Sequence, residues 1–577
     1  MQKLALGNAA VARGVYEAGC RFVSSYPGTP STEITEEVAE YPEVYAEWAP
    51  NEKVAMEAVI GASVAGARAF CAMKHVGLNV AADPLFTASY TGVNGGLVVC
   101  VADDPGMHSS QNEQDSRHYA EAAKLPMLEP SDSAECLMFT KLAFQLSEEY
   151  DTPVIVRTCT RVAHSQGLIP LSARAEIPLK DYKKDIRKYV MSPGNAVGRH
   201  AFVEERMKKL AAYAETAALN RVERGSNIGF ICAGTVYQYI KEVFPEASVL
   251  KLGMAYPMPE KLIRDFAACV EKLYIVEELD PVIETHVRRL GIVPDGGKDL
   301  FGLLGELSQA KIARVMGLTA KKSETFGETL PGRPPVMCAG CPHRGLFAML
   351  KKLKLTVTGD IGCYTLGSMP PLDAMDTTVC MGASIPMAHG FTKVRPEMAK
   401  KTVAVIGDST FMHSGLTGLV NVSYNLGSAK VIVVDNSITG MTGHQQNPTT
   451  GLTLKNEKTP VISIEDAARA CGVKSVRVVD PYDLKATETV LREELEKDGP
   501  SVIISRRPCA LLKYVKHEPA YRVDRDACRA CKACLRLGCP AISFVDGKSQ
   551  IDENQCVGCA VCVQTCPFGA IKGGEKA

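Results

Sequence analysis

Two runs of cysteines in the last fifty residues have the residue type and spacing of iron–sulfur ligands. Each run begins as C-x2-C-x2-C and closes on a Cys-Pro pair. Where 4Fe–4S clusters occur in pairs, the fourth cysteine of each run ligates the other cluster. The spacing therefore predicts two clusters with these ligands: Cys528, Cys531, Cys534 and Cys566 for one, and Cys556, Cys559, Cys562 and Cys539 for the other. Such clusters carry single electrons, so the chain is predicted to transfer electrons one at a time.

A zinc ribbon or a disulfide knot is the alternative interpretation of these runs. In the first run, four residues instead of three precede the last cysteine, which lengthens one loop and leaves the ligand count unchanged. Zinc sites usually use separated CxxC pairs, and disulfides suit secreted chains. Of the 21 cysteines, the thirteen outside the two runs show no disulfide framework, which favours a reducing cytoplasm. The iron–sulfur interpretation is therefore preferred.

A carboxylate and an amide follow two apolar segments further upstream. The segment VAVIG runs into Gly407, Asp408 and Ser409, and the segment VIVVD ends at Asn436, twenty-eight residues after Asp408. If both segments are strands of one parallel sheet, these side chains meet at the carboxyl edge, where ligands bind. Such oxygen donors hold Mg²⁺ beside phosphate oxygens, and Gly440 lets the backbone approach a phosphate. The pattern indicates a magnesium–diphosphate site, although a Gly-Asp pair after a strand is common without one.

The elements that must position these residues alternate between short apolar strands and helices. Before residue 175 the strand candidates are FVSSYP, AFCAMKH, GLVVCVADD and PVIVRTC, with a helix expected over 51–68. A second such unit starts at SNIGFICAG, and a third contains KTVAVIGD, KVIVVDN and SVIISRR. This alternation predicts α/β domains built on parallel sheets that are covered on both faces.

The expected domain boundaries follow shifts in composition along the chain. The charged, broken stretch between the first two units, which includes a predicted helix rich in Glu, Lys and Ala, is expected to be a connector that crosses the surface. The stretch AKKSETFGETLPGRPP is expected to be a linker. The resulting segments are 1–175, 176–225, 226–320, 330–515 and 517–577.

Composition excludes several classes of function. The 577 residues include 65 basic and 65 acidic side chains, so nothing favours binding to nucleic acid or an anionic membrane. No apolar run approaches the ~18 residues of a membrane span. The first residues are interrupted by Asn8, Arg13 and Glu17, unlike a signal peptide. We therefore expect a cytoplasmic protein without a membrane or nucleic-acid partner.

Taken together, the motifs resemble the alpha subunits of indolepyruvate:ferredoxin oxidoreductases, in the 2-oxoacid:ferredoxin oxidoreductase family. The resemblance covers nearly the whole chain and rests on the cysteine runs, the Asp408 and Asn436 pair, and these segments: YPGTPSTEI (26–34), MKHVGLNVAADP (73–84), CAGCPHR (338–344) and GDIGCYTLG (359–367). It implies two thiamine diphosphate-binding domains, a transketolase C-terminal-like domain and a two-cluster bacterial ferredoxin domain. The chain departs from the family pattern in having Asp435 before Asn436 and Ser409 where glycine is usual.

The resemblance also implies roles for individual residues. Asp408 and Asn436 would bind Mg²⁺ through their side chains and Ile438 through its carbonyl. Glu57, nine residues before a glycine, would hydrogen-bond the thiamine pyrimidine ring, with Glu52 as the competing candidate.

Other residues receive less specific roles from the resemblance. Thr29 would contact the substrate carboxylate, with a plain helix cap as its alternative role. A further set would contact the cofactor: Cys338, Cys341, His343, Gly362, Cys363, Gly407, Ser409 and Gly440. The lone CxxC pair, Cys338 and Cys341, lacks a second pair at zinc spacing. Independently of the resemblance, His75, His343, His413 and His444 are candidates for substrate polarisation or proton transfer, with a structural role as the preferred alternative for each.

The implied reaction is oxidative decarboxylation of indole-3-pyruvate with coenzyme A, giving indoleacetyl-CoA, CO₂ and reduced ferredoxin. The cofactors would be thiamine diphosphate, Mg²⁺ and two 4Fe–4S clusters. A smaller beta subunit would complete an α2β2 enzyme. Three alternatives stay open: another 2-oxoacid such as phenylglyoxylate or a branched-chain acid, an electron-transfer subunit with a degenerate thiamine fold, and a non-oxidative decarboxylase.

Overall fold

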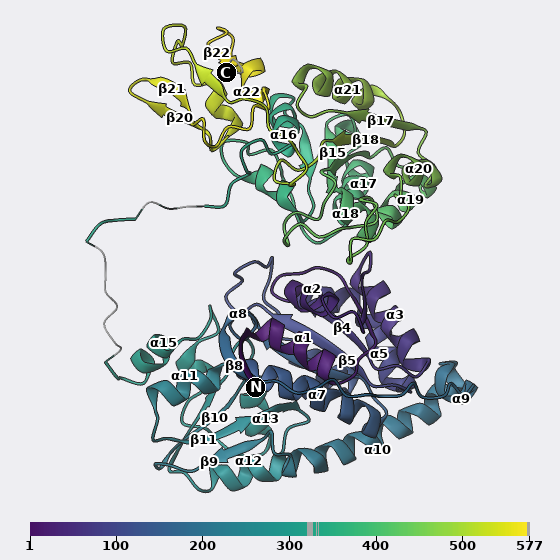
Figure 1. The fold of residues 1–577 in the computed structure, drawn as a ribbon, viewed down its shortest axis with the longest axis vertical. Helices are drawn as coiled ribbons and strands as arrows, with labels where there is room; N and C mark the ends of the chain where they lie inside the picture. Colours follow the sequence, from purple (N-terminus) through teal and green to yellow (C-terminus); the bar gives the residue numbers. More distant parts are fainter. Residues whose placement is uncertain (320–326, 331, 333, 574–577) are drawn as a thin grey trace. The chain divides into compact units, whose positions relative to one another are not determined.

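The computed structural model describes residues 1–319, 327–330, 332 and 334–573. The chain forms two compact units, Met1–Phe326 and Gly327–Ala577, which are considered one at a time (Figure 1). Most of the expected linker, including 320–326, lies outside the described residues.

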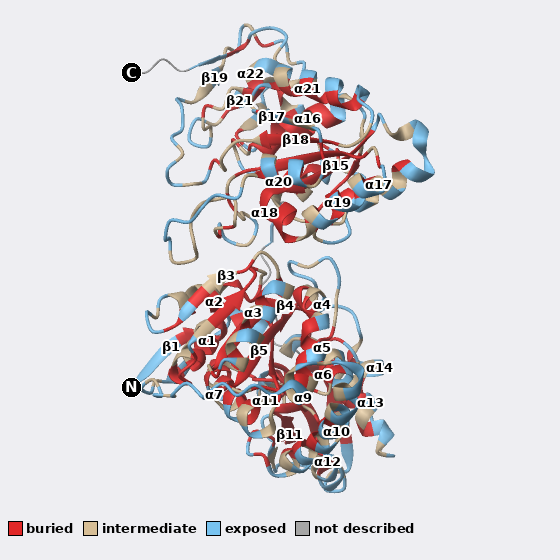
Figure 2. Ribbon diagram, turned by 90° about the vertical axis from the view of Figure 1, so that its right-hand side faces the viewer, coloured by how far each residue is buried: buried red, intermediate tan, exposed pale blue. Residues whose placement is uncertain are grey.

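A seven-stranded sheet forms the centre of the first unit. Its strand order is β12-β6-β7-β5-β4-β2-β3, and all neighbours are parallel except β12 and β6. The strands are β2 (Phe22–Ser25), β3 (Tyr45–Trp48), β4 (Ala69–Lys74), β5 (Leu97–Asp103), β6 (Met127–Leu128), β7 (Val154–Cys159) and β12 (Met254–Tyr256). Every residue of β4, β5 and β7 is buried, as expected for a parallel sheet covered on both faces (Figure 2).

The helices around this sheet fall into two packed groups. The helix α1 contacts α2 and α7, while α3 contacts α4 and α5. Their bounds are α1 (Gly7–Glu17), α2 (Thr32–Ala39), α3 (Glu52–Val64), α4 (His75–Val80), α5 (Ala82–Thr91), α6 (Arg117–Ala123), α7 (Ser133–Tyr150) and α8 (Thr160–His164). A short antiparallel pair, β1 (Gln2–Leu6) with β8 (Gln166–Pro170), closes the edge of this domain. The helix expected over 51–68 is shorter at its carboxyl end, where the chain turns at Gly66 with φ of 100°.

The connector contains the helix that the sequence predicted, and that helix packs on the first domain. After α9 (Ile186–Tyr189), the 24-residue helix α10 (Pro193–Thr216) packs on α5 and buries Val203 and Leu210. The buried Arg206 guanidinium donates to the Ser89 carbonyl at 2.9 Å. The connector therefore helps to build the first unit and is not only a surface crossing.

A four-stranded sheet forms the second α/β domain of this unit. Its order is β13-β10-β11-β9, with β9 antiparallel to its neighbour. The elements are β9 (Arg221–Glu223), β10 (Ile228–Ala233), α11 (Val236–Val243), β11 (Ser248–Leu252), α12 (Glu260–Ala267), β13 (Lys272–Val276), α13 (Val282–Arg289), α14 (Lys298–Phe301) and α15 (Gln309–Val315). Between β11 and α12, the chain leaves this domain as β12 and joins the larger sheet, a connection that the sequence did not reveal.

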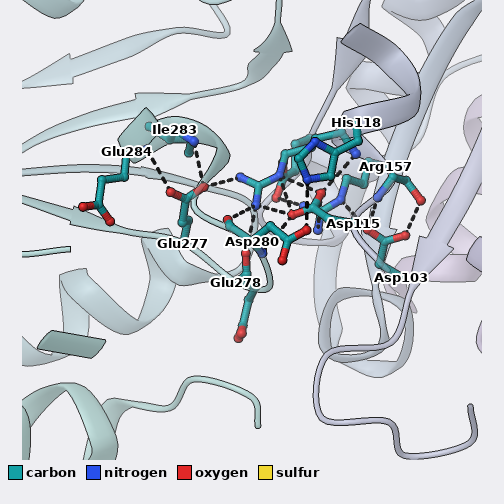
Figure 3. A network of polar contacts seen from close by, with 12 residues as sticks. Asp103, Asp115, His118, Arg157, Glu277, Glu278, Asp280, Ile283 and Glu284 are labelled. Carbon is teal, nitrogen blue, oxygen red and sulfur yellow. Dashed lines mark hydrogen bonds and ion pairs between the residues drawn. The ribbon is translucent and has the colours of Figure 1, made fainter. Parts of the chain in front are cut away.

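A buried network of charges also joins these two domains (Figure 3). The Arg117 guanidinium donates to Asp115 at 2.9 Å, to Glu277 at 2.7 Å and to the Glu278 carbonyl at 2.8 Å. Arg157 donates to Asp103 at 2.7 Å. Each arginine is 2% exposed and has carboxylate partners in its own unit. The second domain is thus fixed to the first by hydrogen-bonded ion pairs.

The second unit contains a five-stranded parallel sheet of order β14-β15-β16-β18-β17. Its strands are β14 (Thr356–Thr358), β15 (Thr402–Gly407), β16 (Lys430–Asp435), β17 (Ser475–Val479) and β18 (Ser501–Arg506). One core contains residues of α16 (His343–Lys352) and α21 (Leu484–Glu496), and another contains residues of α17 (Ser384–Val394), α19 (Leu416–Tyr424) and α20 (Ile464–Ala470). The helical segment after β15 is interrupted: α18 (Asp408–Thr410) and a π-helical turn, Phe411–Gly415, precede α19.

The cysteine-rich tail is a small module of short elements. Two antiparallel pairs, β19 (Tyr521–Val523) with β22 (Ile571–Gly573) and β20 (Ile542–Val545) with β21 (Lys548–Ile551), frame it. A 3-10 turn, Cys534–Leu537, and α22 (Val561–Thr565) complete the module. Buried tail residues share one core with α16, so the tail packs on the sheet domain of the second unit.

Candidate functional site

Asp408 and Asn436 lie at the same edge of the sheet in the second unit. They follow β15 and β16, which pair in parallel with Gly407 opposite Val434. Asp408 is 3% exposed and Asn436 is 7% exposed. Burial raises the pKa of Asp408 to about 7, with a further contribution from Asp435. A buried carboxylate without an ion-pair partner among the described residues fits a cation ligand.

The surroundings of Asp408 are small and polar. The side chains of Asn447 and Thr449 approach its carboxylate at 3.5 Å. A methyl group added at Gly440 would lie 3.4 Å from the Cys363 sulfur and 3.6 Å from the Asn436 amide nitrogen. The structure therefore brings together Cys363 and Gly440, which are more than seventy positions apart in the sequence. The missing side chain at Gly440 leaves room for a ligand to approach the backbone there.

A second buried carboxylate, Asp360, was missed from the sequence although it lies in the quoted GDIGCYTLG segment. It accepts hydrogen bonds from the backbone amides of Gly382 at 2.9 Å and Ser384 at 3.0 Å. These bonds fix the loop that carries Gly362 and Cys363. A methyl group added at Gly407 would come within 2.7 Å of the Tyr364 ring in this loop, so glycine is required there.

Four cysteines from separate segments gather beside this loop. Burial raises the pKa of Cys363 to about 11, and the neighbouring thiols of Cys509 and Cys338 raise it further. Burial likewise raises the pKa of Cys341 to about 12, with contributions from Cys363 and Cys338. The backbone amide of Cys509 donates to the Asn436 carbonyl at 2.9 Å. Cys363 and Cys509 thus lie near the lone CxxC pair, a grouping that no local spacing could reveal.

The predicted histidines occupy different environments. His343 is 3% exposed, and burial lowers its pKa to about 4, so it is neutral at physiological pH. Its ring meets Tyr364 edge-on at 6.0 Å. His444 lies 3.7 Å from the Cys509 sulfur, and His413 contacts the Ser414 hydroxyl at 2.6 Å. His75 belongs to the first unit, where it contacts the Asn112 carbonyl at 3.3 Å.

The second cysteine run lines a cavity together with one cysteine of the first run. Five cysteines line it: Cys539, Cys556, Cys559 and Cys562 of the tail, and Cys341 of the CxxC pair. Burial raises the pKa of Cys562 to about 12, and the other three tail thiols of the cavity raise it further. Apolar side chains such as Leu537 and Ile551 form most of the remaining wall. Four converging thiols in an apolar cavity fit a 4Fe–4S cluster, with Cys539 as the ligand from the other run.

The remaining four tail cysteines are Cys528, Cys531, Cys534 and Cys566. Backbone hydrogen bonds lower the pKa of Cys528, and the Cys534 thiol donates to the Ser549 hydroxyl at 3.3 Å. The Cys566 sulfur accepts from the Ala570 amide at 3.3 Å. Grouping of these residues with Cys531 around one cluster stays a prediction. Within the described residues, no three Cys, His, Asp or Glu side chains converge closely enough for a single metal ion.

In the first unit, the environment of Glu57 does not match its assigned role. Its side chain is 49% exposed on α3 and pairs with Lys53 on the adjacent turn. Glu52 is 5% exposed at the start of the same helix. A methyl group at Gly77, just beyond the carboxyl end of β4, would lie 2.6 Å from its carboxylate. These surroundings favour Glu52 over Glu57 for the proposed contact, because a buried carboxylate is better suited than a solvated one to hold a ring nitrogen; the role of either glutamate stays a prediction.

Thr29 lies in the loop before α2, and Ser31 occupies the cap position of that helix. The Ser109 hydroxyl donates to the Thr29 carbonyl at 3.5 Å. Beside this loop is Lys74, missed from the sequence, whose ammonium donates to the Ser109 carbonyl at 2.6 Å. Burial lowers the pKa of Lys74 to about 8. The contact of Thr29 with a substrate carboxylate stays a prediction.

Three family models match separate parts of the chain. Residues 13–227 match the thiamine diphosphate-binding part of pyruvate flavodoxin/ferredoxin oxidoreductases. Residues 360–505 match the C-terminal binding domain of thiamine pyrophosphate enzymes. Residues 549–572 match a 4Fe–4S binding domain. The α/β fold with two thiamine-type domains and an iron–sulfur tail is thereby confirmed.

Curated relatives match over nearly the whole chain. Indolepyruvate oxidoreductase subunit IorA of Archaeoglobus fulgidus is 40% identical over 99% of this chain and 97% of its own length. The subunit of the same name from Thermococcus kodakarensis is 41% identical with the same coverage. The 2-oxoglutarate synthase subunit KorA of Archaeoglobus fulgidus is 26% identical over 52% of this chain. In the part of the chain that the structure describes, no helix is long and apolar enough to cross a membrane.

Proposed function

The chain belongs to the indolepyruvate oxidoreductase branch of the 2-oxoacid:ferredoxin oxidoreductase family, and we propose that it oxidatively decarboxylates aryl pyruvates, chiefly indole-3-pyruvate. Coenzyme A would take the acyl group, and ferredoxin would take the electrons. The observation that carries this proposal is the second unit, where buried Asp408, Asn436 and a set of four cysteines lie in one sheet domain. A carbon centre that loses CO₂ and a one-electron acceptor are thereby expected near each other.

The residues of the chain are given roles that fit their surroundings. Thiamine diphosphate, when bound, supplies the electron sink that makes loss of CO₂ possible. Asp408, Asn436 and the Ile438 carbonyl would hold Mg²⁺ and through it the diphosphate. Glu52 would donate or accept the proton at the pyrimidine nitrogen, and its burial is the reason for preferring it to Glu57. Thr29 would orient the substrate carboxylate.

Electrons are proposed to leave through a series of clusters. The four cysteines beside the thiamine site, Cys338, Cys341, Cys363 and Cys509, supply the thiolate set of a further 4Fe–4S cluster. The cavity of the second run adjoins it, because Gly340 and Cys341 line that cavity too. The first-run cluster, with Cys566 as its fourth ligand, would pass electrons to ferredoxin. Iron analysis tests the count, with about eight atoms per chain for the two tail clusters and about twelve with the third.

A smaller beta subunit is proposed to complete the enzyme as α2β2. The names of the relatives describe subunits, which implies a second polypeptide. Coenzyme A and the pocket for the aryl ring have no assigned residues in this chain. Activity is therefore expected only from the co-expressed pair.

The test is an anaerobic assay of the co-expressed pair with a panel of 2-oxoacids, coenzyme A and a low-potential dye. Burial of an aryl ring contributes roughly 25 cal/mol per Å² of apolar area. Indolepyruvate, phenylpyruvate and hydroxyphenylpyruvate should therefore have much higher kcat/KM than pyruvate. Comparable use of pyruvate or 2-oxoglutarate would contradict the aryl assignment and leave the thiamine and cluster proposals standing.

An electron-transfer subunit with a degenerate thiamine fold is the rival function. Burial of both Asp408 and Glu52 speaks against it, because a scaffold without cofactor gains nothing from burying two carboxylates. Retention of thiamine diphosphate by the purified chain, measured by fluorescence after oxidation to thiochrome, separates the two. A protein that loads iron and never binds thiamine would favour the rival.

A further inference from the structure

Arg344, the second residue of α16, is a buried arginine that joins two cysteine-bearing segments. Its side chain is 4% exposed. One guanidinium nitrogen donates to the Leu537 carbonyl at 2.7 Å, two residues before Cys539. The other terminal nitrogen donates to the carbonyls of Met337 at 2.6 Å and Cys338 at 3.0 Å. The guanidinium therefore lies between the CxxC loop and the tail module.

No carboxylate in the described residues forms an ion pair with Arg344. Its terminal nitrogens bond to backbone carbonyls, which carry no net charge, and its buried Nε finds no hydrogen-bond partner. An arginine stays protonated in proteins, and a buried charge without a counter-charge costs free energy. An anionic group that is not part of the polypeptide would remove this cost.

The thiols around Arg344 belong to the two adjacent cysteine sets. Arg344 lines the same cavity as Cys539, Cys556, Cys559 and Cys562. Cys341 of the CxxC loop lines this cavity too, and Arg344 donates to the Cys338 carbonyl of the same loop. The guanidinium thus lies beside cysteines of both sets.

We propose that Arg344 is the built-in counter-charge of the cluster held by Cys539, Cys556, Cys559 and Cys562, and that it raises the reduction potential of this cluster. The proposal rests on the proposed function, because it requires a cluster at these cysteines. An added electron makes the cluster more negative, so a fixed positive charge in a low-dielectric cavity stabilises the reduced form more than the oxidised form. Arg344 makes no bond to the cluster and acts as a positioning and electrostatic residue.

The test compares Arg344→Gln with Arg344→Lys in the full-length chain, co-expressed with its partner subunit and purified anaerobically. Glutamine keeps hydrogen-bond donors and removes the charge. Lysine keeps the charge and loses the planar arrangement of N–H donors that the guanidinium provides. Arg536→Gln is the matched control, because Arg536 is an exposed arginine three residues before Cys539. Cluster reduction is followed by electron paramagnetic resonance during a redox titration, and the relevant signal is identified by its loss in Cys539→Ala.

In the glutamine variant, the midpoint potential of this signal should become more negative by at least 59 mV. For one electron, this corresponds to a tenfold change in the reduced-to-oxidised ratio at a given potential. The lysine variant should shift it less, and the Arg536 control should match the wild type. A glutamine variant that keeps the wild-type potential, or equal shifts with glutamine and lysine, would overturn the proposal.

Loading of the cluster gives a second readout. Iron and sulfide are measured before each titration and without any 2-oxoacid. Wild-type protein without clusters would refute the proposed function itself, whereas loaded clusters with unshifted potentials would refute only the role of Arg344. If glutamine abolishes loading and lysine preserves it, the charge is needed for assembly, which supports the proposal. Loss of the cluster in both variants would instead assign Arg344 a purely structural role.

Discussion

The buried arginine network of the first unit and two buried charges of the second unit differ in how they are paired. In the first unit, Arg117 and Arg157 each contact carboxylates of the same unit, so neither guanidinium lacks a counter-charge. In the second unit, Asp408 and Arg344 are similarly buried, and neither has an ion-pair partner among the described residues. Both lie where a cation or an anionic cluster is proposed to bind. The arginines of the network thus need no cofactor to balance their charges, whereas Mg²⁺ and an iron–sulfur cluster are proposed to balance Asp408 and Arg344.

The largest expected effect comes from breaking the paired network. Arg117→Met leaves Asp115 and Glu277 buried without this partner and should destabilise the first unit by about 3–5 kcal/mol. Hydrogen exchange followed by mass spectrometry on peptides of residues 1–319 measures the loss. Arg289→Met, which removes an exposed ion pair with Glu121 in the same unit, is the control and should change stability by less than about 1 kcal/mol. Equal protection in the two variants would contradict the stabilising role of the paired network.

Glu52 and Glu57 provide the next test, because they lie on one helix with opposite burial. Glu52→Gln should retain thiamine and lower kcat by about 10²–10⁴-fold, the usual contribution of a positioned proton-transfer group. Glu57→Gln changes an exposed side chain and should leave kcat close to wild type. Steady-state kinetics with measured thiamine content decides between them. An inactive Glu57 variant beside an active Glu52 variant would restore the assignment made from sequence.

Substitution of Asp408 tests whether this buried carboxylate of the second unit binds a cation. Thiamine diphosphate with Mg²⁺, at a hundred times its Kd, should stabilise the wild-type chain by about 2.7 kcal/mol. Asp408→Asn removes the charged ligand and should abolish this stabilisation, while the cofactor-free variant unfolds no more easily than the wild type at pH 8. Differential scanning fluorimetry with and without cofactor measures both. A normal cofactor-induced shift in the variant would show that Asp408 is not the metal ligand.

The last test concerns Glu278, which lies beside the paired network of the first unit and is paired with no arginine in the described residues. Burial raises its pKa from 4.5 to about 7. Its contribution to stability is therefore fully present below about pH 4.5 and is lost as pH rises through about 7, amounting to at most about 3 kcal/mol. Glu278→Gln should flatten the decline in melting temperature between pH 5 and 8. An unchanged pH profile would mean that the carboxyl is not titrating in the folded state.

Much of the architecture was predictable because each strand is a short apolar run with a helix after it. The strands ending at Gly407 and Asp435 placed Asp408 and Asn436 correctly, since parallel strands end at a common edge. The features that could not be predicted from the sequence depend on contacts between segments that are distant along the chain. Cys509 reaches Asn436 only because β18 lies beside β16, and β12 joins a sheet more than a hundred residues upstream. The choice between Glu57 and Glu52 depended on the same kind of information, because spacing along a helix does not show which side chain is buried.

The central claim is that electrons released from a 2-oxoacid at the thiamine site enter the clusters of the same chain. The most direct measurement mixes the anaerobic, thiamine-loaded enzyme pair with indolepyruvate, without ferredoxin or dye, and follows CO₂ release together with the paramagnetic signals of reduced clusters. The account predicts that both appear in the wild type and that neither appears in Glu52→Gln. Release of CO₂ without any cluster reduction would contradict it and would identify the protein as a non-oxidative decarboxylase.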